Sequence, residues 1–144
     1  MKFKNIDSYN SLQELYQLEV IGATDFYKNI IKEVYLDVQT KSKTKIDLDK
    51  FFLDKLYMGL DNKLIPTIDI GAMLHSKIRW NETQKYKKGD IDDFRHAIAA
   101  LPFYEYFFTE RGLSNMIKEI KYDKKYNCTI ANNNKDIITK LMMI

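Results

Sequence analysis

Apolar residues recur at helical spacing along the first part of the chain. In residues 8–21 they fall three, one, four and one positions apart, which is the spacing of one face of an α-helix. Gly22 is expected to break or kink this helix, since glycine disfavours a helix interior. A second helix is then expected after Thr24 or Asp25, either of which can cap it. Its apolar face consists of Phe26, Ile30, Val34 and Tyr35.

Two more helices are expected in the first half of the chain. Asp47 or Asp49 can cap a helix that runs to about Leu60. Pro66 suits the first turn of the next helix, because the N–H that proline lacks would have no helical partner there. Gly71 lies inside that helix at a cost of about 1 kcal/mol relative to alanine. This cost indicates a close contact with a neighbouring helix.

In the C-terminal part of the chain the pattern alternates between helices and short strands. A helix over residues 91–102 begins with acidic residues and ends near a proline. Residues 104–109 are aromatic and β-branched, and residues 127–132 form a second short candidate, so both are expected to be strands. Helices are expected over residues 113–122 and 136–143.

A strand, a helix and a strand in succession favour a parallel pair joined by a right-handed crossover. The expected fold is therefore helix-rich α/β with a small parallel sheet. With 144 residues, the chain is long enough for one domain with a real core and too short for two comfortable ones. We expect a single domain over residues 1–144, with a helical part over 1–65 and an α/β part over 66–144.

Composition agrees with a helix-dominated protein, since the chain has only five Gly and two Pro residues. The formal charge of +3 is mild and does not by itself indicate a nucleic-acid-binding protein. One cysteine, Cys128, excludes a disulfide within this chain and an all-cysteine metal site. No apolar run approaches the roughly 20 residues of a membrane-spanning helix, and residues 1–10 lack an apolar signal region. These features predict a cytoplasmic protein with no membrane segment.

Three carboxylates are expected to lie at one edge of the predicted sheet: Asp90, Asp93 and Glu110. The helix over 91–102 spans roughly 18 Å, and the strand over 104–109 spans roughly 20 Å in return. Because the two lengths nearly cancel, the start of the helix and the end of the strand should meet. Open α/β sheets bind ligands outside the carboxyl ends of their strands, which is this edge.

Carboxylate oxygens suit Mg²⁺ or Mn²⁺. A metal ion held there can activate water or stabilise a leaving oxygen in phosphodiester cleavage. The same residues have a structural alternative. Asp90 and Asp93 occupy the N-cap and first turn of a helix, where acidic side chains are favoured without a metal. Glu110 would then only begin a loop, and Thr109 would either cap the next helix or orient Glu110.

The run DIDDFRHAIAALPFYEYFFTER, residues 90–111, resembles the C-terminal half of bacterial PIN-like domains. In that superfamily acidic residues open a helix, and the strand that follows ends in a threonine followed closely by an acidic residue. Members use these acids to bind Mg²⁺ or Mn²⁺ and to cut RNA or DNA. The resemblance covers about residues 66–131, and it implies metal binding by Asp90, Asp93 and Glu110.

The chain departs from the PIN-like pattern at the first strand. Such domains begin with an apolar run that ends in an Asp followed shortly by an Asn. Residues 1–10 contain Asp7 and Asn10, but Phe3 and Ile6 are too few apolar residues for a central buried strand. The second, helical acid of the family has no clear match either. The resemblance therefore implies a truncated or degenerate member.

Basic residues surround the expected acidic edge. Those expected to contact nucleic acid are Lys85, Lys87, Lys88 and Arg111. A second group combines lysines with two tyrosines: Lys118, Lys121, Lys124 and Lys125, with Tyr122 and Tyr126. Cationic and aromatic residues together suit single-stranded nucleic acid. The alternative for both groups is an ordinary solvated helix face and loop.

The sequence supports three functional hypotheses. The first is a PIN-like, Mg- or Mn-dependent ribonuclease or other nuclease, intact or lacking part of its site. The second is a non-catalytic nucleic-acid- or protein-binding helical α/β module. The missing first strand motivates it, because an open sheet edge can be filled by a second copy, as in a homodimer, or by a partner chain. The third is an all-helical interaction protein in which residues 104–109 form no strand.

Overall fold

The computed structural model describes residues 9–41, 47, 50, 65–81, 83 and 85–142. Contacts divide the chain into two compact units, residues 1–82 and residues 83–144, and each is described by itself. The helix that begins at Pro66 belongs to the N-terminal unit, although the sequence places it in the α/β part. The helix predicted to follow Asp47 or Asp49 lies largely outside the described residues.

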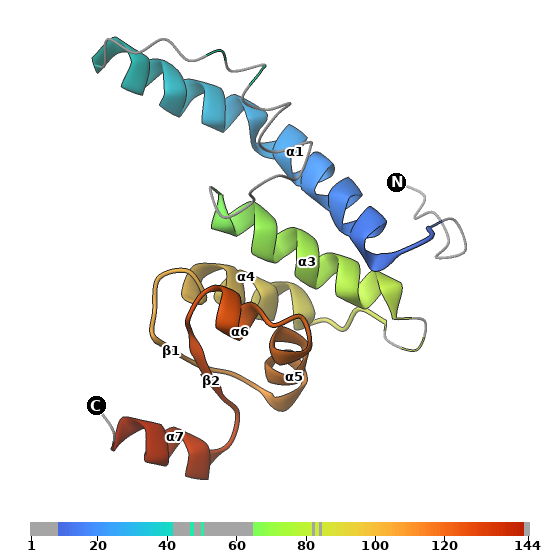
Figure 1. Ribbon diagram of the computed structural model, residues 1–144, viewed down its shortest axis with the longest axis vertical. Helices are drawn as coiled ribbons and strands as arrows, with labels where there is room; N and C mark the ends of the chain where they lie inside the picture. Colours follow the sequence, from blue (N-terminus) through green and yellow to red (C-terminus); the bar gives the residue numbers. More distant parts are fainter. Residues whose placement is uncertain are drawn as a thin grey trace. The chain divides into compact units, whose positions relative to one another are not determined.

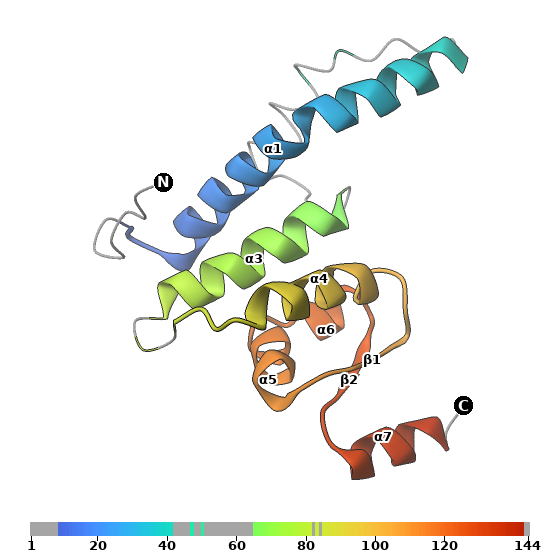
Figure 2. The same ribbon diagram turned by 180° about the vertical axis from the view of Figure 1, so that it is seen from behind.

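In the ranges that the structure describes, the N-terminal unit contains the helices α1 (Leu12–Lys41) and α3 (Pro66–Trp80), which lie side by side (Figure 1; Figure 2 shows them from behind). Their contact buries Tyr16 and Val20 of α1 together with Ile68 and Ala72 of α3. Pro66 lies in the first turn of α3, as predicted. A backbone N–H at this position would have no helical partner, so the N–H that proline lacks costs no hydrogen bond.

The prediction that Gly22 breaks the first helix is wrong. α1 continues through Gly22 and is 30 residues long. A glycine in a helix interior costs about 1 kcal/mol relative to alanine, and packing of the nearby Val20 and Ala23 in the core with α3 offsets that cost. Thr24 does not cap a second helix. Its side chain is fully buried within α1, and its hydroxyl oxygen has no hydrogen-bond partner in the described structure.

Three of the four residues predicted for the apolar face of the second half of α1 are exposed, and the fourth, Tyr35, is half-buried. Phe26, Ile30 and Val34 are 76%, 56% and 59% exposed. Tyr27 and Ile31, each one position later, pack against the core instead. One position corresponds to about 100° around a helix. The predicted spacing of four residues was therefore correct, but the predicted face lies about 100° around the helix from the face that contacts α3. Both sets of residues are apolar, and contact with α3 selects one of them.

Among its described residues the C-terminal unit contains four helices and two short strands. In chain order they are α4 (Asp90–Ala100), β1 (Tyr106–Phe108), α5 (Arg111–Glu119), α6 (Tyr122–Lys125), β2 (Thr129–Ala131) and α7 (Asn134–Leu141). The strands pair in parallel, with Tyr106 opposite Thr129 and Phe108 opposite Ala131. The predicted parallel pair is confirmed, and the fold is helix-rich α/β with a small two-stranded sheet.

Several boundaries differ from the predicted ones. Each strand has three residues, fewer than in the predicted runs. The helix predicted over residues 113–122 is two helices, α5 and α6, which Lys121 separates with its left-handed φ of 59°. α4 ends at Ala100, shortly before Pro102, as the proline predicts.

Packing within the C-terminal unit brings helix faces onto the strands. α4 contacts β1, and α5 contacts β2. The buried side chains include Phe94 and Leu101 at the two ends of α4, Ile117 of α5 and Ile130 of β2. This packing fixes the start of α4 and the residues that follow β1. None of the helices in the described ranges is long and apolar enough to cross a membrane.

Candidate functional site

A small pocket of about 70 Å³ lies in the C-terminal unit, where the start of α4 meets the turn between β1 and α5. Three of its lining residues are the carboxylates singled out in the sequence, Asp90, Asp93 and Glu110. The other lining residues are Lys87, Phe94, Gly112, Leu113 and Met116. The helix start and the strand end meet here, as the lengths of the two predicted elements require.

Asp90 is the first residue of α4, and Gly89 holds the N-cap position that the sequence assigns to Asp90. The Asp90 side chain contacts the turn that precedes the helix. Its Oδ2 accepts a hydrogen bond of 2.7 Å from the backbone N–H of Lys87. Its negative charge also lies at the positive end of the α4 dipole. One Asp90 oxygen is therefore used to shape the turn that precedes α4.

Asp93 lies one turn further along α4 and is half-buried at the pocket. No hydrogen bond or ion pair within the described ranges involves its carboxylate. Its neighbour Asp92 is exposed and forms an ion pair with Arg95, 3.0 Å between Oδ1 and Nη1. Of the three pocket carboxylates, Asp93 is the one whose oxygens accept no hydrogen bond from the described residues.

Glu110 is the N-cap of α5, a role that the sequence offers to Thr109. Its Oε1 accepts a hydrogen bond of 2.7 Å from the backbone N–H of Leu113. Thr109 instead continues the strand ladder, where its N–H donates to the carbonyl of Ala131. Gly112 makes room for the Glu110 carboxylate, because a Cβ there would lie 2.6 Å from Oε1. The sequence signal for this arrangement is a glycine two residues after an acidic N-cap.

The donor chemistry of the pocket suits Mg²⁺ or Mn²⁺, which prefer oxygen ligands. The described part of the chain nevertheless contains no group of three or more His, Cys, Asp or Glu side chains arranged to hold a metal ion. Mg²⁺ is often held by one or two carboxylates, with waters and substrate phosphates as its other ligands. The pocket fits that mode, centred on Asp93, and does not fit an all-protein cage.

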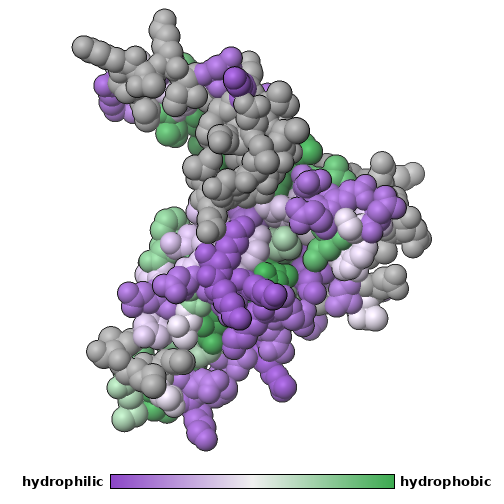
Figure 3. Space-filling model, in the orientation of Figure 1, coloured by the Kyte–Doolittle hydropathy of each residue, from purple (hydrophilic) through white to green (hydrophobic). Residues whose placement is uncertain are grey.

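Of the four basic residues expected to contact nucleic acid, the pocket includes only Lys87. The other three, Lys85, Lys88 and Arg111, are exposed and do not line it. In the second basic group, Lys118, Lys121 and Lys124 are exposed, and hydrophilic side chains dominate the face of the unit that Figure 3 shows. Lys125 lies over the ring of Tyr122, with Nζ 4.8 Å from its centroid.

Cys128 immediately precedes β2 and is buried. Burial raises the pKa of its thiol to about 11, and the negative charge of Asp123 acts in the same direction. The thiol is therefore neutral at ordinary pH. Because the thiolate is the reactive form of cysteine, Cys128 does not supply a nucleophile to this unit.

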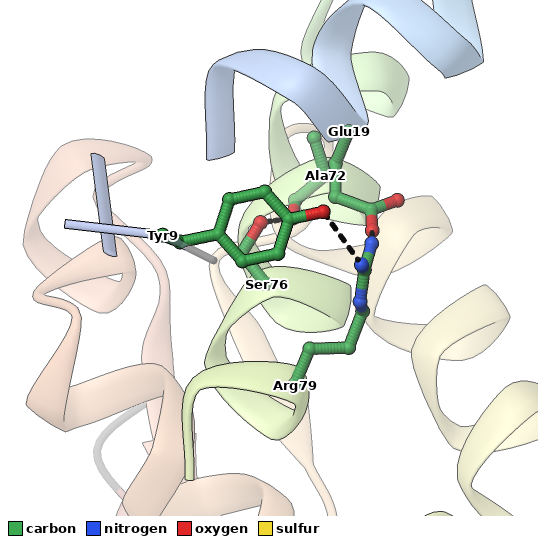
Figure 4. Close-up of polar contacts among 5 residues, drawn as sticks. All are labelled: Tyr9, Glu19, Ala72, Ser76 and Arg79. Carbon is green, nitrogen blue, oxygen red and sulfur yellow. Dashed lines mark hydrogen bonds and ion pairs between the residues drawn. The ribbon is translucent and has the colours of Figure 1, made fainter. Parts of the chain in front are cut away.

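The N-terminal unit has its own polar contacts between α1 and α3 (Figure 4). Arg79 of α3 forms an ion pair with Glu19 of α1 and donates a hydrogen bond of 3.4 Å to the hydroxyl of Tyr9. Deeper in the interface, the hydroxyl of Tyr16 donates a hydrogen bond of 2.5 Å to the buried Asp69 carboxylate. Contacts of this kind tie the two helices together, and sequence periodicity gave no signal for them.

Comparisons of the chain with protein-family models, with curated proteins and with solved structures found no match.

Proposed function

We propose that the C-terminal unit is a PIN-like nuclease module that acts on RNA or DNA at the acidic pocket. One observation carries this proposal: Asp90, Asp93 and Glu110, which come from two separate segments, line a single pocket. They are the three acids that the PIN-like resemblance implies as metal ligands. The parallel pairing of β1 and β2 supports the proposal further, because the carboxyl end of β1 is where Glu110 follows.

The proposal gives the pocket residues distinct roles. Asp93 would hold Mg²⁺ or Mn²⁺, because neither of its oxygens accepts a hydrogen bond among the described residues, and Asp90 and Glu110 would each add the oxygen that does not accept a backbone N–H. A cation bound there would supply the positive charge that activates water and stabilises a leaving oxygen. Lys87 offers a positive charge to the substrate phosphate. With one cysteine in the chain, the proposal places this activity in the reducing cytoplasm.

A cleavage assay with a labelled single-stranded RNA and a labelled DNA, with and without Mg²⁺ or Mn²⁺, tests the nuclease. We expect metal-dependent cleavage that chelation abolishes and that Asp93→Asn reduces by about 100-fold or more. Asp92→Asn is the matched control, because Asp92 lies next to Asp93 but is exposed and outside the pocket. Equal activity of the two variants, or cleavage that ignores chelation, would refute the assigned site.

A second candidate is a non-catalytic module that binds nucleic acid or a protein. One observation favours it: Asp90 and Glu110 each already accept a backbone hydrogen bond, as structural caps do. The same assays separate the two candidates. RNA binding that persists without metal, is unchanged by Asp93→Asn and is never followed by cleavage would establish the second candidate in place of the first.

A further inference from the structure

Among the described residues, no strand pairs with the outer edge of β1. The N–H of Thr129 donates to the carbonyl of Glu105 at 2.7 Å, and the N–H of Thr109 donates to the carbonyl of Ala131 at 3.1 Å. In a parallel ladder each residue directs its N–H and C=O to the same side, and successive residues alternate. Residues 105, 107 and 109 therefore face β2. Tyr106 and Phe108 direct their backbone groups outward, where no strand of the described residues receives them.

Large aromatic side chains accompany this open edge. Phe103 and Tyr104, just before β1, are 73% and 65% exposed, and Phe108 is 36% exposed. Tyr106 and Phe108 share one face of the strand, with ring centroids 6.4 Å apart. Proteins that keep an edge strand in solution usually protect it with lysine, proline or a bulge. β1 has none of these, and its three residues carry no charge.

We propose that β1 pairs through this outer edge with β1 of a second copy of the chain, in antiparallel orientation. Two identical edges related by a two-fold axis run antiparallel and satisfy each other. Tyr106 of one copy then exchanges backbone hydrogen bonds with Phe108 of the other, and Phe107 lies opposite its own counterpart. Two marginal two-stranded sheets become one continuous sheet of four strands. This inference does not rest on the nuclease proposal.

Charge complementarity favours the antiparallel arrangement over a parallel one. Glu105 precedes β1 and Arg111 follows it, and both are exposed. With Phe107 opposite its counterpart, antiparallel pairing brings Glu105 of each copy opposite Thr109 of the other, at the end of the strand that leads to Arg111 at the start of α5. Parallel pairing would instead place the two Glu105 side chains together. The nearby Glu110 does not oppose this, because its carboxylate turns into α5 to bond the Leu113 N–H.

Proline at residue 106 tests the proposal. The Tyr106 N–H points away from β2, so Tyr106→Pro removes an outward donor and leaves the β1–β2 ladder intact. Sedimentation over a range of protein concentrations gives the dimer dissociation constant for each variant. We expect a dimer for the natural chain and a dissociation constant at least about tenfold higher for Tyr106→Pro. Unchanged far-ultraviolet circular dichroism would verify that this variant is folded.

Phe108→Lys provides a second variant that leaves the backbone donors in place. It puts two positive charges into the same small interface, and we expect it to weaken the dimer as well. Phe26→Lys is the control, because Phe26 is 76% exposed but belongs to α1 in the other unit. A natural chain that stays monomeric at its solubility limit overturns the proposal. So does a dimer that survives both β1 variants, or one that only Phe26→Lys disrupts.

Discussion

Gly112 stands where any larger residue would collide with the carboxylate of Glu110. A Cβ at position 112 would lie 2.6 Å from Oε1 of Glu110 and 3.3 Å from its Cδ. That same Oε1 accepts the N–H of Leu113 and caps α5. The glycine and the glutamate therefore act as a pair, in which one leaves the space that the other fills.

Gly112→Ala is expected to displace the Glu110 carboxylate from the Leu113 N–H. Loss of the cap lowers the free energy of unfolding by about 1 kcal/mol. The better helix propensity of alanine offsets part of that loss. The direct measurement is hydrogen exchange of the Leu113 amide, which we expect to be severalfold faster in the variant. Glu110→Ala should produce the same change at Leu113. Full protection of that amide in Gly112→Ala would show that the carboxylate has not moved.

Gly22→Ala should have the opposite effect. A Cβ at Gly22 meets no atom within 4 Å, and the residue lies inside the continuous helix α1. Alanine then stabilises the N-terminal unit by about 1 kcal/mol, because it has the better helix propensity and no clash. Urea unfolding followed by the fluorescence of Trp80, the one tryptophan of the chain, measures this in the unit that contains α3. A lower midpoint in the variant would contradict the continuous helix.

Tyr16→Phe removes the hydroxyl that donates to the buried Asp69 carboxylate. The carboxylate loses a donor in a site without access to bulk water, so we expect a loss of about 1–3 kcal/mol in the free energy of unfolding. Tyr27→Phe is the matched control from the same helix and the same core. The Tyr27 hydroxyl forms no hydrogen bond with the described residues, so the change in stability should be less than about 0.5 kcal/mol. Equal losses in the two variants would assign the effect to packing alone.

The Cys128 thiol predicts a fall in stability at alkaline pH. Its pKa in the folded protein is about 11, raised by burial from an ordinary value of 9.0. Between these values the unfolded chain has released the thiol proton and the folded chain has kept it. The contribution of the thiol to the free energy of unfolding is therefore fully present below about pH 9 and is lost as the pH rises toward 11.

Other groups titrate in the same alkaline range, so the thiol must be measured as a difference in stability between the natural chain and a variant without it. Free energies of unfolding for the natural chain and for Cys128→Ala, taken at about pH 8 and about pH 10, isolate the part due to the thiol. We expect the natural chain to lose more stability than the variant over this interval. Parallel losses would mean that the thiol ionises in the folded protein as readily as in the unfolded chain.

Local signals in the sequence predicted most elements of the C-terminal unit, though not the division of one predicted helix into α5 and α6. The aromatic run before Thr109 and the later run around Ile130 were sufficient to predict two strands, and the helical segment between them indicated parallel pairing. Pro66 and Pro102 likewise marked a helix start and a helix end. Each of these signals acts within a few residues, so it can be recognised in the sequence without knowledge of the fold.

Features that depend on distant contacts were missed. Gly22 lies in a continuous helix because packing with α3 outweighs its poor propensity, and Phe26 faces outward because that packing selects Tyr27. The bond between Tyr16 and Asp69 joins residues 53 positions apart, which no periodicity reveals. At the pocket, the acidic residues were predicted from the sequence. Only the structure shows that Glu110 caps α5 while Asp93 lines the pocket.

Helices α1 and α3 of the N-terminal unit differ in length by a factor of two. α1 has 30 residues and α3 has 15, which correspond to about 45 Å and about 22 Å. Beyond Thr24, the described contacts of α1 with the core come from Tyr27 and Ile31, which are half-buried. Closer to its carboxyl end, the described contacts of α1 include the exposed pair of Lys41 with Asp37. We therefore expect α1 to unwind from its carboxyl end toward Ile31, where packing against the core begins.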